Sequence, residues 1–235
     1  MLEFVTKEKY WQLLDQGIDE QLAPAEFPWH LKSVQDVLAY HYLGNPSGEV
    51  IGEVGGGDSR LLPVLRKANR CFNIEKFEGR DGGPGSEIKL RGVRNVHAFV
   101  GEFSNDLADS SFDALVSVSV VEHIPNDQMI DFIRDCHRIL KPGGRMIHLV
   151  DMYLAETRLA YNASRISLYE AAFKDQLFEP MDEQRIRGRE DLSFRGSYCT
   201  NPDNVMYLWN QVNADLRDLR ENSQSVAISW GGTAL

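Results

Sequence analysis

The segment that most constrains the fold is a short apolar run that stops at three glycines. Val50, Ile51 and Val54 precede Gly55–Gly57, and a helical pattern of apolar residues follows, with Leu61, Leu62, Val64 and Leu65. This order predicts a buried strand, a tight turn and a helix. Glycines let the backbone approach a ligand closely, and the free amides at a helix start favour polar or negatively charged groups. Glu75 follows the turn by about 20 residues, where nucleotide-binding folds place an acid for the ribose hydroxyls.

The string from Glu53 to Ser59, EVGGGDS, resembles motif I of the class I S-adenosylmethionine-dependent methyltransferases, acid-x-Gly-x-Gly-x-Gly. Glu53, Gly55 and Gly57 match this motif, Gly56 is an extra glycine, and Ser59 stands where the last glycine usually falls. A dinucleotide-binding fingerprint instead needs a glycine at the next position, which Arg60 occupies.

Three further strings extend the resemblance over residues 49–152. SFDALVSVSVVEHIP at 111–125 resembles motif IV and the loop after it, and RILKPGGRMIH at 138–148 resembles the family's helix-to-strand turn. VGEF at 100–103 stands where the family carries an acid after its third strand. The resemblance implies an S-adenosylmethionine site formed by Glu53, Gly55, Gly56, Gly57, Glu75, Lys76, Glu102, Phe103 and Ser119.

The predicted strand order gives these residues separate tasks. Ligands of open parallel sheets sit beyond the carboxyl ends of the strands, where all of these positions would converge. Glu75 suits the ribose diol, and by the resemblance Glu102 accepts from the adenine amino group while Phe103 lies against the ring. Glu53 either adds negative field for the cationic amino group or anchors the glycine turn, and both roles are compatible.

His123 and Asp151 are the candidate catalytic residues. Methyl transfer needs alignment and exclusion of water, and a hydroxyl acceptor also needs a base. His123 follows the fourth strand, and histidine is the side chain that most often serves as such a base, although the alternative is a hydrogen bond to the loop or the cofactor. Asp151 follows the fifth strand, where it either orients a substrate or caps a helix. His148 is expected in the core, and no spacing supports a metal site.

Net charge and missing motifs indicate which class of methyl acceptor to expect. The 235 residues carry a net charge of -10, whereas nucleic-acid binders usually show a basic face. The basic residues of 185–195 are interspersed with acids, which favours a solvated surface. No Asn-Pro-Pro-Tyr string or Pro-Cys pair follows the fourth strand. We therefore expect a small-molecule or glycan acceptor, methylated at a hydroxyl oxygen, and no nucleic-acid partner.

Cysteine usage and hydropathy suggest a cytoplasmic protein without a membrane partner. Cys71, Cys136 and Cys199 are odd in number and widely spaced, so no disulfide framework or metal spacing is evident, and the first two are expected as buried thiols. The first residues lack a signal-peptide pattern, and no apolar run is long enough to span a bilayer.

The predicted fold is α/β, with a doubly wound, mostly parallel sheet of the seven-stranded, Rossmann-like type. Residues 1–45 are expected to be a helical N-terminal segment, 46–152 the cofactor-binding core, and 153–235 a lid of helices with closing strands. Helices are predicted around Trp11–Leu14, near 31–42, from Asp58 or Ser59 onward, and near 127–140, 155–175 and 202–221. Strands are predicted at 50–54, 71–75, 93–100, 112–120, 146–151, 192–198 and 224–230.

Two other functions fit parts of the pattern. An NAD(P)-dependent oxidoreductase shares the strand, turn, helix and acid, but Arg60 and the EHIP and KPGG strings count against it. A non-catalytic protein of the same fold that binds S-adenosylmethionine is the second alternative.

Overall fold

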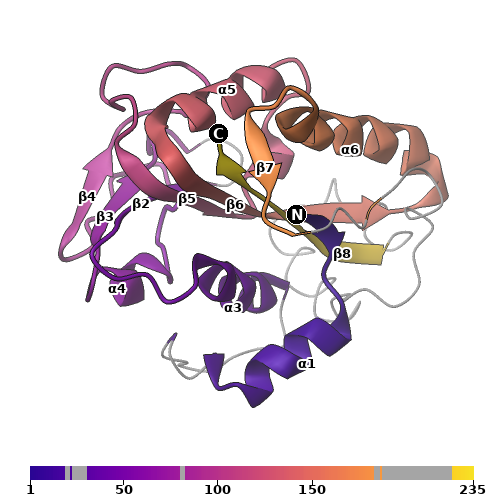
Figure 1. Ribbon diagram of the computed structural model, residues 1–235, viewed down its shortest axis with the longest axis horizontal. Coiled ribbons are helices and arrows are strands. Elements are labelled where there is room, and N and C mark those ends of the chain that lie inside the picture. The colour runs from indigo at the N-terminus through magenta and orange to yellow at the C-terminus, as the bar shows by residue number, and fades with distance from the viewer. Residues whose placement is uncertain (19–21, 23–30, 80–82, 183–185, 187–223) are drawn as a thin grey trace.

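A mixed sheet organises the molecule, with helices on both of its faces (Figure 1). The computed structural model describes residues 1–18, 22, 31–79, 83–182, 186 and 224–235. Within these residues the sheet has eight strands, in the order β1-β8-β6-β5-β2-β3-β4, and β7 also pairs with β8. The strands are β1 (Leu2–Phe4), β2 (Val50–Val54), β3 (Arg70–Ile74), β4 (Val93–Val96), β5 (Phe112–Val118), β6 (Leu140–Leu154), β7 (Phe178–Pro180) and β8 (Gln224–Ala234).

The centre of the sheet is parallel, as the sequence predicts. β2 pairs in parallel with both β3 and β5, β3 with β4, and β5 with β6. β8 runs antiparallel to β1, β6 and β7. The chain order reverses between β2 and β5, which is the switch point where open α/β sheets bind their ligands. The described sheet differs from the expected seven-stranded type by one strand, and β1 lies in a segment for which helices were expected.

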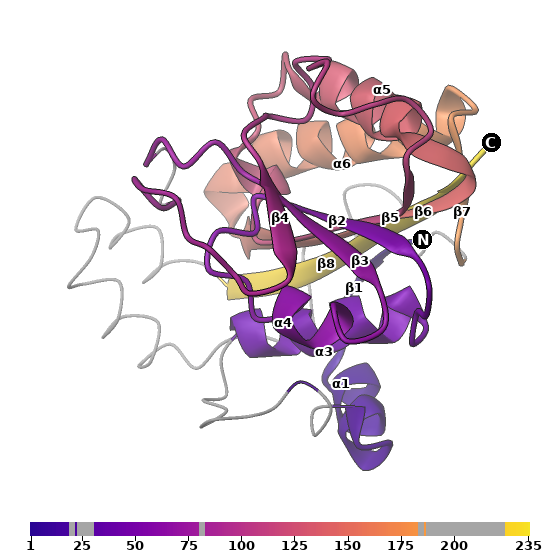
Figure 2. The same cartoon turned by 90° about the vertical axis from the view of Figure 1, so that its left-hand side faces the viewer.

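The helices form two layers, and each layer has its own hydrophobic core. α5 and α6 cover one face, while α3 and α4 cover the other and α1 packs outside α3 (Figures 1 and 2). Helical bounds are α1 (Lys7–Asp15), α3 (Leu31–Leu43), α4 (Leu62–Leu65), α5 (Met129–Ile139) and α6 (Leu159–Lys174), with 3-10 turns η2 (Val121–His123) and η3 (Glu156–Arg158). The predictions near 31–42, 127–140 and 155–175 are therefore confirmed, whereas those at 192–198 and 202–221 lie outside the described residues.

Alternating residues of β6 separate the two cores. Met146 and Val150 belong to the cluster under α5 and α6, and Ile147 and Leu149 belong to the cluster under α3.

Cys71 and Cys136 are buried free thiols, as predicted, and Cys199 lies outside the described residues. His148 is fully buried, and burial lowers its pKa to about 3, so the prediction of a core histidine is confirmed.

The KPGG string is part of β6. α5 ends at Ile139, as expected of a helix followed by these residues, but β6 begins immediately at Leu140. Phe112 pairs with Leu140 and Ala114 with Arg145, so two steps along β5 correspond to five along β6, and the extra residues bulge outward. Gly143 has a φ of +79°, a backbone conformation that glycine adopts without strain.

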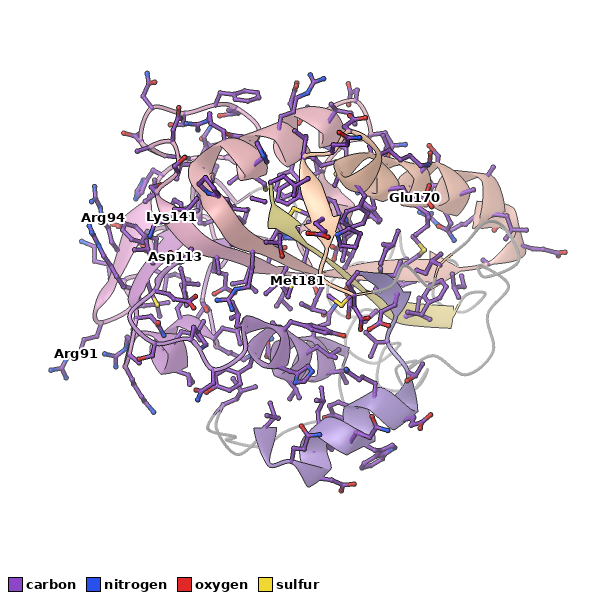
Figure 3. The ribbon with its side chains drawn as sticks, viewed as in Figure 1. Arg91, Arg94, Asp113, Lys141, Glu170 and Met181 are labelled. Atoms are coloured by element: carbon purple, nitrogen blue, oxygen red, sulfur yellow. The ribbon has the colours of Figure 1, made fainter. Side chains whose placement is uncertain are left out.

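Asp113 ties three parallel strands together near this bulge. It accepts a hydrogen bond from the Val50 amide at 2.8 Å and from Lys141 Nζ at 2.8 Å on each carboxylate oxygen. Figure 3 shows Asp113 and Lys141 side by side. Together with Glu49 and Arg145 they line a hollow of about 300 Å³ at the amino ends of β2 and β5, opposite the predicted cofactor site.

No helix within the described ranges is long and apolar enough to cross a bilayer.

Candidate functional site

The glycine turn after β2 is closely packed against its neighbours. Gly55 has a φ of +64°, and a Cβ atom there would lie 2.6 Å from Val120 Cγ2. A Cβ at Gly56 would lie 2.7 Å from Asn73 Oδ1, and the Asn73 Nδ2 donates to the Gly57 carbonyl at 2.9 Å. The turn is thus held from both neighbouring strands, and only glycine fits its first position without displacement.

Glu53 is buried directly beneath this turn. Ser59 Oγ donates a short hydrogen bond to Glu53 Oε2 and accepts from the amides of Leu61 and Leu62 at 3.1 and 2.9 Å. Burial raises the pKa of Glu53 to about 8; the Ser59 hydrogen bond opposes this rise, and nearby Asp36 adds to it. The residue that departs from motif I therefore links the acid to the start of α4. The helix itself begins at Leu62, later than the sequence suggests.

The side chains after β3 reach across to those after β4. Glu75 is half-buried just past β3, and its Oε1 accepts from the Phe77 amide at 3.0 Å. Lys76 Nζ lies 2.6 Å from Glu102 Oε2 and 4.4 Å from the centre of the Phe99 ring. The structure thus brings Lys76 and Glu102 together, with one oxygen of Glu102 already occupied by the ammonium group.

A buried acid of α5 anchors the loop at 101–103. Asp135 is fully buried, and its Oδ2 accepts from the amides of Gly101 at 2.6 Å and Phe103 at 3.1 Å. Its Oδ1 accepts from Arg138 Nε at 2.8 Å. Phe103 has a φ of +52° and remains 45% exposed, so its ring is presented to solvent by a backbone that α5 fixes. The role of Asp135 is not apparent from the sequence, because an acid in an amphipathic helix resembles any solvent-facing residue.

Ser119 follows β5, whereas Asp151 lies within β6 and pairs with Ala227 of β8, so the expectation that it follows the strand is wrong. Both side chains meet a residue of α3 that the sequence did not single out. Gln35 Nε2 donates to Asp151 Oδ1 at 2.6 Å, and Ser119 Oγ lies 2.8 Å from Gln35 Oε1 and 3.2 Å from Asp151 Oδ1. Gln35 is fully buried, whereas Ser119 and Asp151 are partly exposed. Two predicted residues with separate predicted roles therefore belong to one hydrogen-bonded cluster.

His123 lies in η2, on the loop that follows β5, and its side chain is exposed. Arg165 of α6 fixes this loop from beneath. Arg165 is 2% exposed and donates at 2.7 Å to the carbonyls of Val121 and Ile124, and at 2.9 Å to Asn126 Oδ1. Among the described residues, none forms a hydrogen bond with the His123 ring, which is also not joined to the cluster around Asp151.

The strand tips therefore carry a glycine turn over a buried acid, a second acid, a fixed aromatic loop and a partly exposed carboxylate. Residues 53–148 match the family model described as a methyltransferase domain, which begins at Glu53 and ends at His148. This central segment of the chain is therefore a methyltransferase domain. The family suggested by the EVGGGDS, EHIP and KPGG strings is thus confirmed.

Solved structures resemble the fold of this methyltransferase over most of its length. A Galdieria sulphuraria protein assigned as a sarcosine dimethylglycine methyltransferase has a TM-score of 0.55 at 14% identity, covering 98% of this chain and 91% of that one. The Streptomyces coelicolor geranyl diphosphate C-methyltransferase, solved with Mg²⁺, geranyl diphosphate and S-adenosyl-L-homocysteine, has a TM-score of 0.52 at 12% identity, covering 92% and 88%. YcgJ from Bacillus subtilis has a TM-score of 0.50 at 16% identity, covering 87% and 98%.

At these identities the likeness concerns the fold of the methyltransferase. A comparison with curated proteins found no match. The acceptor must therefore be argued from the site itself.

Proposed function

We propose that this methyltransferase transfers a methyl group from S-adenosylmethionine to a hydroxyl oxygen of a small molecule or sugar. The observation that carries the cofactor part is the closely packed glycine turn over the buried Glu53. The hydroxyl acceptor is supported by the partly exposed carboxylate of Asp151 and by the absence of nucleic-acid methylation strings after β5.

The described geometry fits the cofactor in three parts. Gly55, Gly56 and Gly57 would take the methionine end against bare backbone, with Glu53 supplying negative charge for its ammonium group when ionised. Glu75 would accept from the ribose hydroxyls. Glu102 and Phe103 would bind the adenine, since the Phe103 ring is exposed and its loop is fixed by Asp135. Lys76 would act through Glu102, which it contacts.

The reaction asks three things of the protein. The bound cofactor supplies a methyl group on a sulfonium, and displacement requires the acceptor atom in line with the breaking bond. The protein must align the acceptor, exclude water and receive the acceptor's proton. His123 and Asp151 are the two predicted groups for the last task, and Ser119 stands beside the second of them.

Residues 1–45 and 153–235 would form the lid over the acceptor. α3 contributes Gln35 to the cluster at Asp151, and α6 holds the His123 loop through Arg165. Both flanking segments therefore reach the carboxyl ends of the central strands from opposite faces of the sheet, which is where an acceptor would enter.

Calorimetric titration with S-adenosylhomocysteine and with NADH tests the cofactor assignment. We expect binding of the first in the micromolar range and none of the second; the reverse result would support the oxidoreductase. A methyl-transfer screen with hydroxyl, amine, thiol and carbon acceptors then tests the acceptor. Transfer to hydroxyl compounds supports the proposal. Transfer to carbon or thiol acceptors alone refutes the oxygen assignment, and silence across all classes with the cofactor bound favours a non-catalytic protein.

A further inference from the structure

The Asp151 carboxylate is held on one side and open on the other. Its Oδ1 lies 2.6 Å from Gln35 Nε2 and 3.2 Å from Ser119 Oγ. No hydrogen bond reaches Oδ2 from any residue in the described ranges. A carboxylate oxygen accepts about two hydrogen bonds, so the side chain is fixed through Oδ1 and keeps Oδ2 for a ligand.

The hydrogen bonds of the cluster run in a defined direction. The single hydroxyl proton of Ser119 has its closer acceptor in Gln35 Oε1, at 2.8 Å. Once the Gln35 carbonyl accepts from Ser119, the amide places its N–H groups toward Asp151. An N–H donor at Oδ1 fixes the carboxylate and leaves Oδ2 as a hydrogen-bond acceptor. Gln35 is fully buried in the α3 core, so this orientation is fixed by packing.

His123 is a weaker candidate for the same task. Its loop is anchored through backbone carbonyls that Arg165 binds from the α6 side, while its side chain is exposed. Asp151, in contrast, belongs to a cluster in which Gln35 donates a hydrogen bond to it and Ser119 fixes the Gln35 amide. A proton acceptor in methyl transfer must be aligned with the acceptor atom, and alignment is the property that this cluster provides.

We propose that Asp151, positioned by Gln35 and Ser119, faces the acceptor side of the transferred methyl group and selects acceptors with an O–H or N–H bond at the methylated atom. This inference rests on the proposed function. As the oxygen or nitrogen lone pair forms its bond to the methyl carbon, the carbon–sulfur bond breaks and its electrons stay on sulfur as a neutral thioether. Asp151 Oδ2 accepts the proton of the O–H or N–H group, and water later removes it.

Two cofactor analogues test this placement without knowledge of the acceptor. Sinefungin carries an amine where the methyl group is attached in S-adenosylmethionine, whereas S-adenosylhomocysteine has nothing there. If Asp151 faces that position, its carboxylate binds the ammonium group of sinefungin. We expect Asp151→Asn to weaken sinefungin binding about tenfold or more, since a hydrogen bond to a charged group contributes about 1.5–3 kcal/mol. Binding of S-adenosylhomocysteine should change by less than about twofold.

Matched variants separate the alternatives. Asp131→Asn makes the same change on the exposed side of α5 and should leave both affinities unaltered. If His123→Asn, and not Asp151→Asn, weakens sinefungin selectively, or if neither does, the assignment of Asp151 is overturned. If the wild-type protein fails to bind S-adenosylhomocysteine, the proposed function itself is refuted. Retained S-adenosylhomocysteine binding also shows that each variant is folded.

The positioning role of Gln35 has a separate readout. Gln35→Leu removes the N–H donor to Asp151 Oδ1 and the acceptor of the Ser119 hydroxyl, and it leaves an apolar side chain in the buried α3 core. The Asp151 carboxylate then loses its fixed orientation, so the preference for sinefungin over S-adenosylhomocysteine should fall about threefold or more. Gln12→Leu, the same change on the exposed face of α1, should not alter this preference. An unchanged preference in Gln35→Leu, with S-adenosylhomocysteine still bound, overturns the positioning role.

Discussion

Replacing Gly55 by alanine should damage the cofactor turn in two separable ways. Alanine in the left-handed region costs about 1–2 kcal/mol, because its Cβ crowds the following carbonyl. The new Cβ would also lie 2.6 and 2.8 Å from the two methyl carbons of Val120, and overpacking of this kind costs about 1–3 kcal/mol. We therefore expect the free energy of unfolding to fall by about 2–5 kcal/mol.

Gly48→Ala is the matched control. Gly48 also has a positive φ, +76°, but a Cβ there would meet no atom within 4 Å. Gly48→Ala should lower the free energy of unfolding only by the cost of the left-handed backbone, about 1–2 kcal/mol, and should leave cofactor affinity unchanged. Gly55→Ala should additionally weaken S-adenosylhomocysteine binding about tenfold or more, because the turn must move away from Val120 and its amides move with it.

Denaturant unfolding and calorimetry of both variants measure these two quantities. Adding Val120→Ala to Gly55→Ala removes the two crowded methyl carbons and should restore the overpacking part, which a double-mutant cycle isolates. Equal losses of stability in Gly55→Ala and Gly48→Ala, with equal affinities for S-adenosylhomocysteine, would refute the reasoning. The turn would then have neither the packing nor the binding role assigned to it.

Three further predictions concern the cofactor side. Because the pKa of Glu53 is about 8, this acid is mostly protonated at pH 6 and ionises as the pH rises. Binding of the cofactor's ammonium group should therefore tighten between about pH 6 and 8. Glu53→Gln should abolish this pH dependence, which calorimetry at several pH values measures. Phe103→Ala should weaken S-adenosylhomocysteine binding about tenfold, since a stacked base contributes about 1–3 kcal/mol. The melting temperature should not fall, because the Phe103 ring is 45% exposed. Unchanged affinity would contradict the role of Phe103 in adenine binding. Asp135→Asn breaks a buried charge pair and the anchor of two amides. It should therefore lower the free energy of unfolding by about 3 kcal/mol, measured by denaturant unfolding, and weaken adenosine binding as well. A loss of stability below about 1 kcal/mol would contradict the anchoring role of Asp135.

The sequence predicted those features that depend on local patterns. The continuous apolar run at 112–118 identifies a central strand, and the spacing of Phe132, Ile133 and Cys136 identifies the buried face of α5. The glycines of 55–57 followed by Glu75 locate the ligand end of the sheet. These signals suffice for the fold class and for the cofactor end of the site.

Features that depend on distant partners were missed. Gln35 and Asp135 look like solvent-facing polar residues, and their roles arise only when α3 meets β6 and α5 meets the 101–103 loop. The strand predicted at 93–100 ends at Val96, and the helix expected from Asp58 or Ser59 begins at Leu62. In the second case Ser59 accepts from the Leu61 and Leu62 amides and donates to Glu53, and so forms a turn ahead of the helix.

The pairing of β8 has a consequence for biosynthesis. β8 (Gln224–Ala234) is the antiparallel neighbour of β1, β6 and β7, and its Trp230 pairs with Leu2 of β1. A ribosome must therefore release residue 234 before the N-terminal strand finds its place, although the five parallel strands have emerged long before. Until then β6 presents an unpaired apolar edge, so newly made chains should depend on chaperones and should be most prone to aggregate before β8 has been synthesised.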